Sequence, residues 1–115
     1  MSVESNCIFC KIVAGQVPSR KAYEDEDLFV FHDIAPWAPV HLLVIPKRHY
    51  TSMYDVGPEQ SAMLGRMLAL APKLMLEQGV TNGFRTLINT GQDGLQEVQH
   101  LHMHLIGGPR PWLKG

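Results

Sequence analysis

Two stretches of the chain repeat apolar residues at the period of a helix. The shorter one predicts a helix over about residues 7–14. Ser5 and Asn6 are its candidate N-caps, because their side-chain oxygens accept from free backbone N–H groups, and Gly15 is its expected terminator.

The longer apolar stripe predicts a helix that begins at Pro58, where the missing N–H of a first-turn proline costs little. The stripe runs to about Gln78, and Gly79 follows it as a cap. Pro72 lies inside the pattern. We expect it to kink the helix or divide it in two, since an interior proline costs about 3 kcal/mol.

Strands are predicted where branched and aromatic residues cluster between turn residues. The first two flank an acidic turn at 25–27 and form a plausible hairpin. The predicted strands cover residues 21–24, 28–31, 41–45 and 84–89, and a last one lies in the stretch 99–108, where Gly107 and Gly108 end it. Five strands and a helical pair indicate one α+β domain over residues 1–115, built on an antiparallel sheet.

The last of these strands carries three histidines in alternation. His100, His102 and His104 are separated by Leu101 and Met103, and residues two apart share a face of a strand. A helix would bring together only the first and last of the three. The sequence therefore predicts one imidazole face that looks into a site.

Three kinds of chemistry fit such a face, and the spacing leaves them open. The histidines are polar groups on a solvated strand, ligands of a catalytic zinc ion with an open position, or a nucleophile with its helpers. In the third case a neutral imidazole attacks phosphorus, and water resolves the nucleotidyl intermediate. His102, with a histidine on each side, suits that role best, and the glycine-bearing loop 91–96 is expected to supply backbone donors for phosphate.

Composition narrows the class of protein. The chain has 115 residues, 45% hydrophobic and 18% charged, which is ordinary for a globular domain. Its net charge of −1 argues against a broad surface for nucleic acid or anionic membrane. The polar start of the chain indicates no signal peptide, and no run approaches the ~20 apolar residues of a membrane span. We therefore expect a cytoplasmic protein.

Cys7 and Cys10 are the only cysteines, in Cys-x-x-Cys spacing. The pair alone fits a redox motif, half of a zinc site or two buried thiols. Redox motifs of this kind usually follow a strand in a βαβ setting, and no predicted strand precedes Cys7.

The string His100–Ile106 resembles the signature of the histidine triad (HIT) family, His-φ-His-φ-His-φ-φ, where φ is apolar. CIFCKIVAGQVPS, FHDIAPWAPVHLLVIPKRHY, NTGQDG and LIGGPRPW are similar to the Hint branch of that family, in the right order and over most of the chain. The resemblance implies a homodimer whose sheet is continuous between the two copies. It implies hydrolysis of purine nucleoside 5′-phosphoramidates, such as AMP–lysine, without a catalytic cofactor.

The resemblance also implies roles for individual residues. His102 is the expected nucleophile, the backbone carbonyl of His100 holds its tautomer, His104 contacts phosphate and leaving group, and His41 supports them. Asp33 matches the carboxylate that takes the ribose hydroxyls. The matching apolar base and ribose pocket consists of Ile8, Phe9, Ile12, Phe31, Ile34 and Leu43, and the phosphate-side positions are Asn89, Leu95, Glu97 and Val98.

Two of these positions depart from many Hint proteins. Glu97 stands where many have serine, and an ionised carboxylate cannot donate to the leaving amine. We interpret it as favouring a cationic leaving group; an unchanged ranking of amines in Glu97→Ser would contradict that. Leu95 replaces glycine and narrows the freedom of its loop.

In several HIT relatives a Cys-x-x-Cys pair joins two histidines in a structural zinc site. Here the resemblance implies His49 and His100 as the partners of Cys7 and Cys10. Such a closed Cys₂His₂ set stabilises without catalysing. It would leave His102 and His104 free of metal.

Three other functions stay open at this stage. Gln96 lies next to the position where Fhit-like hydrolases of dinucleoside polyphosphates usually carry glutamine. A nucleotide-binding interaction module with incidental hydrolysis is the second alternative, and a zinc enzyme using the three histidines is the third.

Overall fold

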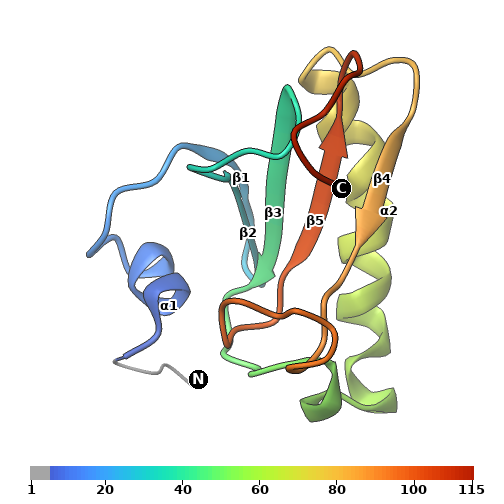
Figure 1. The fold of residues 1–115 in the computed structure, drawn as a ribbon. Helices are drawn as coiled ribbons and strands as arrows, with labels where there is room; N and C mark the ends of the chain where they lie inside the picture. Colours follow the sequence, from blue (N-terminus) through green and yellow to red (C-terminus); the bar gives the residue numbers. More distant parts are fainter. Residues whose placement is uncertain (1–5) are drawn as a thin grey trace.

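Strand β3, Val40–Pro46, is the middle strand of a five-stranded antiparallel sheet in the computed structural model, which describes residues 6–115. The strand order is β1-β2-β3-β5-β4, and every neighbouring pair is antiparallel (Figure 1). The other strands are β1 Lys21–Glu24, β2 Leu28–His32, β4 Phe84–Leu87 and β5 Met103–Gly107. The predicted antiparallel α+β architecture is confirmed, including the β1–β2 hairpin.

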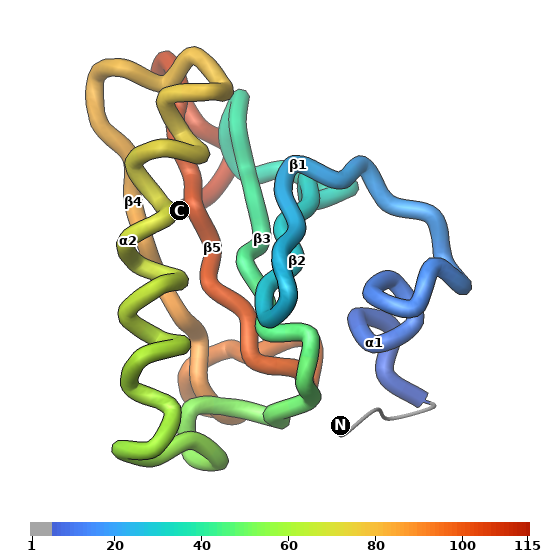
Figure 2. Tube along the Cα trace, turned by 180° about the vertical axis from the view of Figure 1, so that it is seen from behind, coloured from blue at the N-terminus to red at the C-terminus, as the bar shows by residue number. Residues whose placement is uncertain are grey.

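The two faces of the sheet pack against different helices, which lie on opposite sides of it (Figures 1 and 2). Side chains alternate along each strand, so neighbouring residues enter different cores. Helix α2, Ser61–Glu77, packs with one set: Leu28, Val30, Leu42, Val44, Met103 and Leu105. Helix α1, Ile8–Val13, packs with the other: Phe29, Phe31, Leu43 and Ile45.

Helix α1 begins at Ile8, and its N-cap lies one residue later than the predicted Asn6. The Cys7 Sγ accepts from the Cys10 N–H at 3.3 Å, so Cys7 caps the helix instead of Asn6. The other candidate, Ser5, lies outside the described residues. Gly15 follows the helix with φ +77°, the left-handed conformation expected of a terminating glycine.

The long helical stretch opens with 3₁₀ turns, η1 Met53–Asp55 and η2 Pro58–Gln60, before α2 begins. Pro72 does not divide α2, which continues to Glu77. Because Pro72 lies on the exposed side of the helix, water can reach the carbonyl group that its missing N–H leaves without a partner.

The histidine strand is shorter than predicted. Pairing between β3 and β5 starts at Val44 and Met103, so the prediction that the strand already includes His100 is wrong. Continued pairing would set Leu101 against Pro46, which has no N–H to donate. Leu101 donates instead to the Tyr50 carbonyl at 2.7 Å. His100 and His102 therefore belong to the loop that enters β5.

Among residues 6–115, no helix is both long and apolar enough to cross a bilayer.

Candidate functional site

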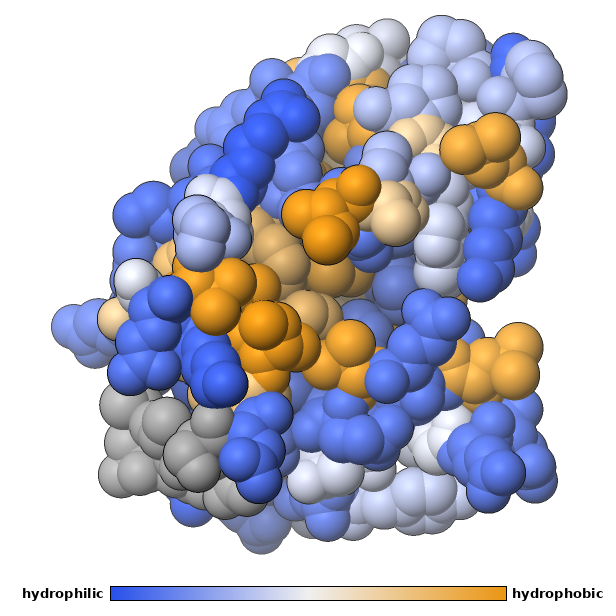
Figure 3. Space-filling view, turned by 60° about the vertical axis from the view of Figure 1, so that its left-hand side comes forward, coloured by the Kyte–Doolittle hydropathy of each residue, from blue (hydrophilic) through white to orange (hydrophobic). Residues whose placement is uncertain are grey.

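A cavity of about 590 Å³ opens between the start of β5, the loop before it and the C-terminal segment. Figure 3 shows a hollow, bordered by hydrophobic side chains, on the face of the molecule that carries α1. The cavity is lined by Trp37, Leu87, Asn89, Gln92, Leu95, Gln96, Glu97, His102, His104, Lys114 and Gly115. Two of the three predicted histidines thus line one cavity, together with predicted phosphate-side residues.

His102 is oriented by backbone. Its Nδ1 lies 2.7 Å from the carbonyl oxygen of His100, which accepts hydrogen bonds only. The Nδ1 therefore carries the proton, and the Nε2 keeps its lone pair. Phe9 packs edge-on against the ring, with the centroids 5.3 Å apart. This is the tautomer that a nucleophilic imidazole needs.

His104 receives its tautomer from a short relay. The backbone N–H of Trp37 donates to His41 Nδ1 at 3.1 Å, so His41 carries its proton on Nε2. That Nε2 lies 2.8 Å from His104 Nδ1 and donates to it. His104 is consequently protonated on Nε2, and in this tautomer it offers an N–H donor beside the lone pair of His102.

Burial keeps these imidazoles neutral. It lowers the pKa of His104 to about 3, an effect to which the charges of His102 and His41 add. Burial likewise lowers the pKa of His41. In His102 burial lowers the pKa while the hydrogen bond to His100 opposes it, and burial lowers the pKa of His100 to about 4. At pH 7 the site holds uncharged imidazoles with defined donors and lone pairs.

Asp33 has two contacts, one local and one toward the site. Its Oδ1 accepts from the Ala35 N–H at 2.9 Å, a loop-capping bond. Its Oδ2 lies 3.6 Å from His41 Nε2. Asp33, His41 and His104 have possible metal-ligand atoms within 4.8 Å of one another. Two of these residues, His41 and His104, are however already hydrogen-bonded to each other.

Several backbone N–H groups of the glycine-bearing loop beside the cavity donate to other groups of the same loop. Leu95 N donates to Gln92 at 3.0 Å, Gln96 N donates to Gly91 at 3.0 Å, and the Gly91 N–H donates to Gln96 Oε1 at 2.9 Å. Asn89 Nδ2 ties the loop further by donating to Gly94 O at 2.8 Å. The expectation that this loop offers backbone donors to phosphate is therefore wrong for the N–H groups of Gly91, Leu95 and Gln96.

The remaining predicted nucleotide residues fall into two groups. Ile8, Ile34 and Leu95 are exposed, and Ile34 is 99% exposed. A buried cluster holds Phe9, Ile12, Phe31 and Leu43, with Val98 packed against it. This cluster adjoins the site through Phe9 and His102. Their contact with a base or ribose stays a prediction.

The two cysteines meet His49 and His100 behind the cavity, as the resemblance implied. Cys7 Sγ lies 3.3 Å from His100 Nδ1, and Cys10 Sγ lies 3.4 Å from His49 Nδ1 and 3.6 Å from His100 Nδ1. All four donor atoms lie within 4.8 Å of one another. Tetrahedral zinc with ordinary bond lengths separates sulfur and nitrogen by about 3.5 Å, so this group is a possible metal-binding cluster.

The contacts of the other ring nitrogen, Nε2, in His100 and His49 are compatible with metal binding through Nδ1. His100 Nε2 donates to the Pro46 carbonyl at 2.8 Å, which leaves the lone pair of Nδ1 directed at the cysteines. His49 Nε2 lies 3.3 Å from Thr51 Oγ1. His100 therefore has two contacts of different kinds: its carbonyl orients His102 and its ring faces the thiols.

Sequence reasoning missed Trp37 and Lys114, and it named Gln96 only for the Fhit-like alternative. Trp37 stacks on His104, with centroids 4.5 Å apart, and Lys114 Nζ lies 4.7 Å from the centre of the Trp37 ring. Gln96 is buried, and its Nε2 donates to the carbonyls of Thr51 and Val98. The place of Trp37 between two Ala-Pro pairs was its sequence signal, and Lys114 had none.

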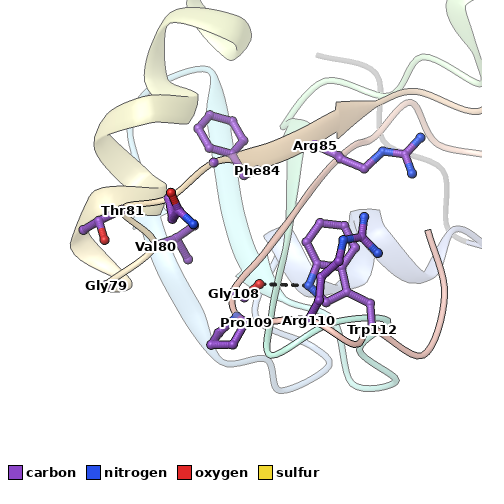
Figure 4. Close-up of a pocket in the computed structure, with 11 residues that line it drawn as sticks. Gly79, Val80, Thr81, Phe84, Arg85, Gly108, Pro109, Arg110 and Trp112 are labelled. Atoms are coloured by element: carbon purple, nitrogen blue, oxygen red, sulfur yellow. Dashed lines mark hydrogen bonds between the residues drawn. The ribbon is translucent and has the colours of Figure 1, made fainter.

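A second cavity, of about 540 Å³, lies near the end of β5 away from the histidines (Figure 4). Arg85 and Arg110 line it, the Arg110 guanidinium lies 4.0 Å from the centre of the Trp112 ring, and the indole N–H donates to Gly108 O at 2.9 Å. Its lining holds no histidine, cysteine or carboxylate.

Comparison with known sequences agrees with the triad geometry. A family model described as "Scavenger mRNA decapping enzyme C-term binding" matches residues 6–113. The chain is 50% identical over 104 residues to Protein HitA of Neisseria gonorrhoeae, covering 90% of this chain and 97% of HitA. It is 42% identical over 102 residues to the purine nucleoside phosphoramidase of Escherichia coli K12, covering 88% and 86%.

Solved structures share the fold. A histidine triad protein from Clostridium difficile has a TM-score of 0.89 at 41% identity, covering 94% of this chain and 95% of its own. A HIT family hydrolase from Legionella pneumophila has a TM-score of 0.87 at 42% identity, covering 91% and 95%. A zinc-bound histidine triad protein from Mycobacterium smegmatis has a TM-score of 0.79 at 34% identity, covering 89% and 74%. The chain therefore belongs to the histidine triad (HIT) family and is a hydrolase of the kind found there.

Proposed function

We propose that this chain hydrolyses the P–N bond of purine nucleoside 5′-phosphoramidates through a nucleotidyl-His102 intermediate. The observation that carries the proposal is the hydrogen bond between His102 Nδ1 and the His100 carbonyl, because it leaves the Nε2 lone pair available beside the cavity. The similarity to the Escherichia coli purine nucleoside phosphoramidase supports the substrate class.

The first step forms a bond from His102 Nε2 to phosphorus as the P–N bond of the substrate breaks. The leaving nitrogen keeps the electron pair of that bond and takes a proton from water. The His104 Nε2–H donates to a phosphoryl oxygen, where negative charge accumulates. In the second step water attacks phosphorus as the bond from phosphorus to His102 Nε2 breaks. Nε2 keeps the electron pair of that bond, so His102 returns to its neutral form, and the attacking water gives its proton to the hydroxide that the first step left. The nucleoside monophosphate then leaves.

Nucleotide binding would use both groups of predicted residues. Asp33 would accept from the ribose hydroxyls with its Oδ2, since Oδ1 is held by Ala35. The base and ribose would lie against Ile8, Phe9, Ile12, Phe31, Ile34 and Leu43. Asn89, Leu95, Glu97 and Val98 would flank the phosphate and the leaving group.

We also propose that zinc binds at Cys7, Cys10, His49 and His100 as a structural ion. The spacing of the four donor atoms and the zinc-bound relative support this assignment. Zinc would tie α1 to the segment that enters β5. It would supply stability rather than chemistry, and catalysis would need no metal.

A homodimer with a continuous sheet is part of the same proposal. β4 is the last strand in the sheet order, so its outer edge is available to a second copy. Light scattering of the purified protein would report twice the mass of one chain.

The decisive experiment compares substrates. Purified protein is mixed with the phosphoramidate of AMP and a fluorescent amine, with diadenosine polyphosphate, and with AMP alone. Fast release of the amine with slow cleavage of the polyphosphate supports the proposal. Faster polyphosphate cleavage would favour the Fhit-like alternative, although Gln96 is already engaged with Thr51, Val98 and Gly91. Binding of AMP without any turnover would favour a binding module.

A further inference from the structure

Trp37 and Lys114 form one wall of the histidine cavity although 77 positions of sequence separate 37 from 114. The N–H groups of Leu113 and Lys114 donate to the Trp37 carbonyl at 2.7 and 3.1 Å. Arg85 Nη1 also donates to the Gly115 carbonyl. Two backbone hydrogen bonds and one from the Arg85 side chain thus hold the C-terminal segment beside the site.

The ammonium group of Lys114 is held toward the reacting histidines. It lies 4.7 Å from the centre of the Trp37 indole, a cation–π distance, and the same indole stacks on His104 at 4.5 Å. Lys114 lines the cavity with His102 and His104. Its charge is also among the groups that lower the pKa of His41 and His104. A cation therefore lies at the cavity that His102 and His104 line, beside the indole that stacks on His104.

The cavity also holds a negative charge, on Glu97. Glu97 also lines the cavity, and its charge bears on His102, whereas that of Lys114 bears on His104. Glu97 and Lys114 therefore give the cavity one anionic and one cationic side chain.

We propose that Lys114, positioned by Trp37, selects leaving groups that carry a carboxylate, as amino acids joined to phosphorus through their amine do. This inference rests on the proposed phosphoramidate hydrolysis and names the class of amine. The carboxylate of such an amine lies two bonds from the leaving nitrogen, close enough to meet an ammonium group on the His104 side of the cavity.

The test uses two substrates that differ in one charge: the phosphoramidates of AMP with glycine and with glycinamide. For the wild-type protein we expect kcat/KM to be about two- to fivefold higher for the glycine compound, the size of one partly screened ion pair. Lys114→Met should bring the ratio to about one, and Lys114→Arg should restore it. Added salt should reduce the wild-type ratio.

Lys73→Met is the matched control, because Lys73 is an exposed lysine on α2, across the sheet from the cavity. It removes the same charge and should leave the ratio unchanged. If Lys114→Met lowers both substrates equally, Lys114 contacts the shared phosphate and the inference is wrong. Equal wild-type rates on both substrates also overturn it while the proposed function stands. If neither substrate turns over, the proposed function fails and the inference fails with it.

Discussion

His41 Nε2 and His104 Nδ1 are 2.8 Å apart, and this hydrogen bond leaves the proton of His104 on its Nε2. His41 carries its own proton on Nε2, because its Nδ1 accepts from the backbone N–H of Trp37. We therefore expect His41 to act as a positioning residue rather than a reacting one. Its effect on catalysis passes through the tautomer of His104.

Replacing His41 separates this role from simple packing. His41→Ala should lower kcat/KM about tenfold or more, because His104 loses the donor that fixes its Nε2–H. His41→Gln should retain more activity, since its amide can accept from Trp37 and donate to His104. Steady-state kinetics with one phosphoramidate measures both variants. Equal losses in the two variants would mean that the relay is unimportant.

The buried histidines should make stability depend on pH. With a folded pKa of about 3, His104 stays neutral where the unfolded chain, with an ordinary pKa near 6.5, takes up a proton. Protonation of the unfolded state therefore lowers the free energy of unfolding as pH falls from about 6.5 toward 3, and stability is highest above that range.

Urea unfolding at pH 7, 6 and 5 measures this dependence. His104→Gln should reduce the slope by up to about 1.4 kcal/mol per pH unit, the contribution of one proton. The other buried histidines have lowered pKa values as well, so part of the slope should remain. An unchanged slope in the variant would show that His104 is not held neutral by the fold.

The cluster of Cys7, Cys10, His49 and His100 should bind zinc in the purified protein. The purified protein should hold one zinc ion per chain, and chelation should lower the melting temperature. Cys10→Ser should abolish zinc binding, whereas His102→Ala should keep it because His102 is outside the four-residue cluster. Elemental analysis that finds no zinc, in a protein whose thiols react freely, would contradict the assignment.

Leu95 offers a test of strain beside the site. Its φ of 63° is left-handed, which costs a residue with a side chain about 1–2 kcal/mol, and its side chain is 76% exposed. Leu95→Gly should therefore raise the free energy of unfolding by about 0.5–1 kcal/mol, after the entropy that glycine adds to the unfolded chain. Leu95→Ala keeps the strain and should not stabilise. Urea unfolding that ranks alanine above glycine would refute the strain argument.

The spacing of apolar residues and the residue types were sufficient to predict the sheet and both helices. Apolar residues recur on the buried face of each element, so their spacing indicates whether the element is a strand or a helix. The start of β5 was not predictable in this way. His100 and His102 alternate with apolar residues as a strand would, but Pro46 cannot pair, and the chain bonds to Tyr50 instead. Pairing partners decide where a strand begins, and a single segment does not reveal them.

The site shows a similar division. The histidines were predictable because their chemistry and spacing are both in one short string. Trp37 and Lys114 were not, since their contact depends on the C-terminal segment folding back across the sheet. Gln96 is polar and buried, and only the folded loop reveals that its amide holds Thr51 and Val98.

The central claim is that His102 becomes covalently nucleotidylated. Rapid mixing with an AMP phosphoramidate, acid quenching and intact mass spectrometry should reveal a species heavier by one AMP less one water, and peptide mapping should locate it on His102. The species should be lost in His102→Ala and should form without added metal. Turnover that yields AMP with no adduct at any mixing time, or an adduct on another residue, would contradict the account.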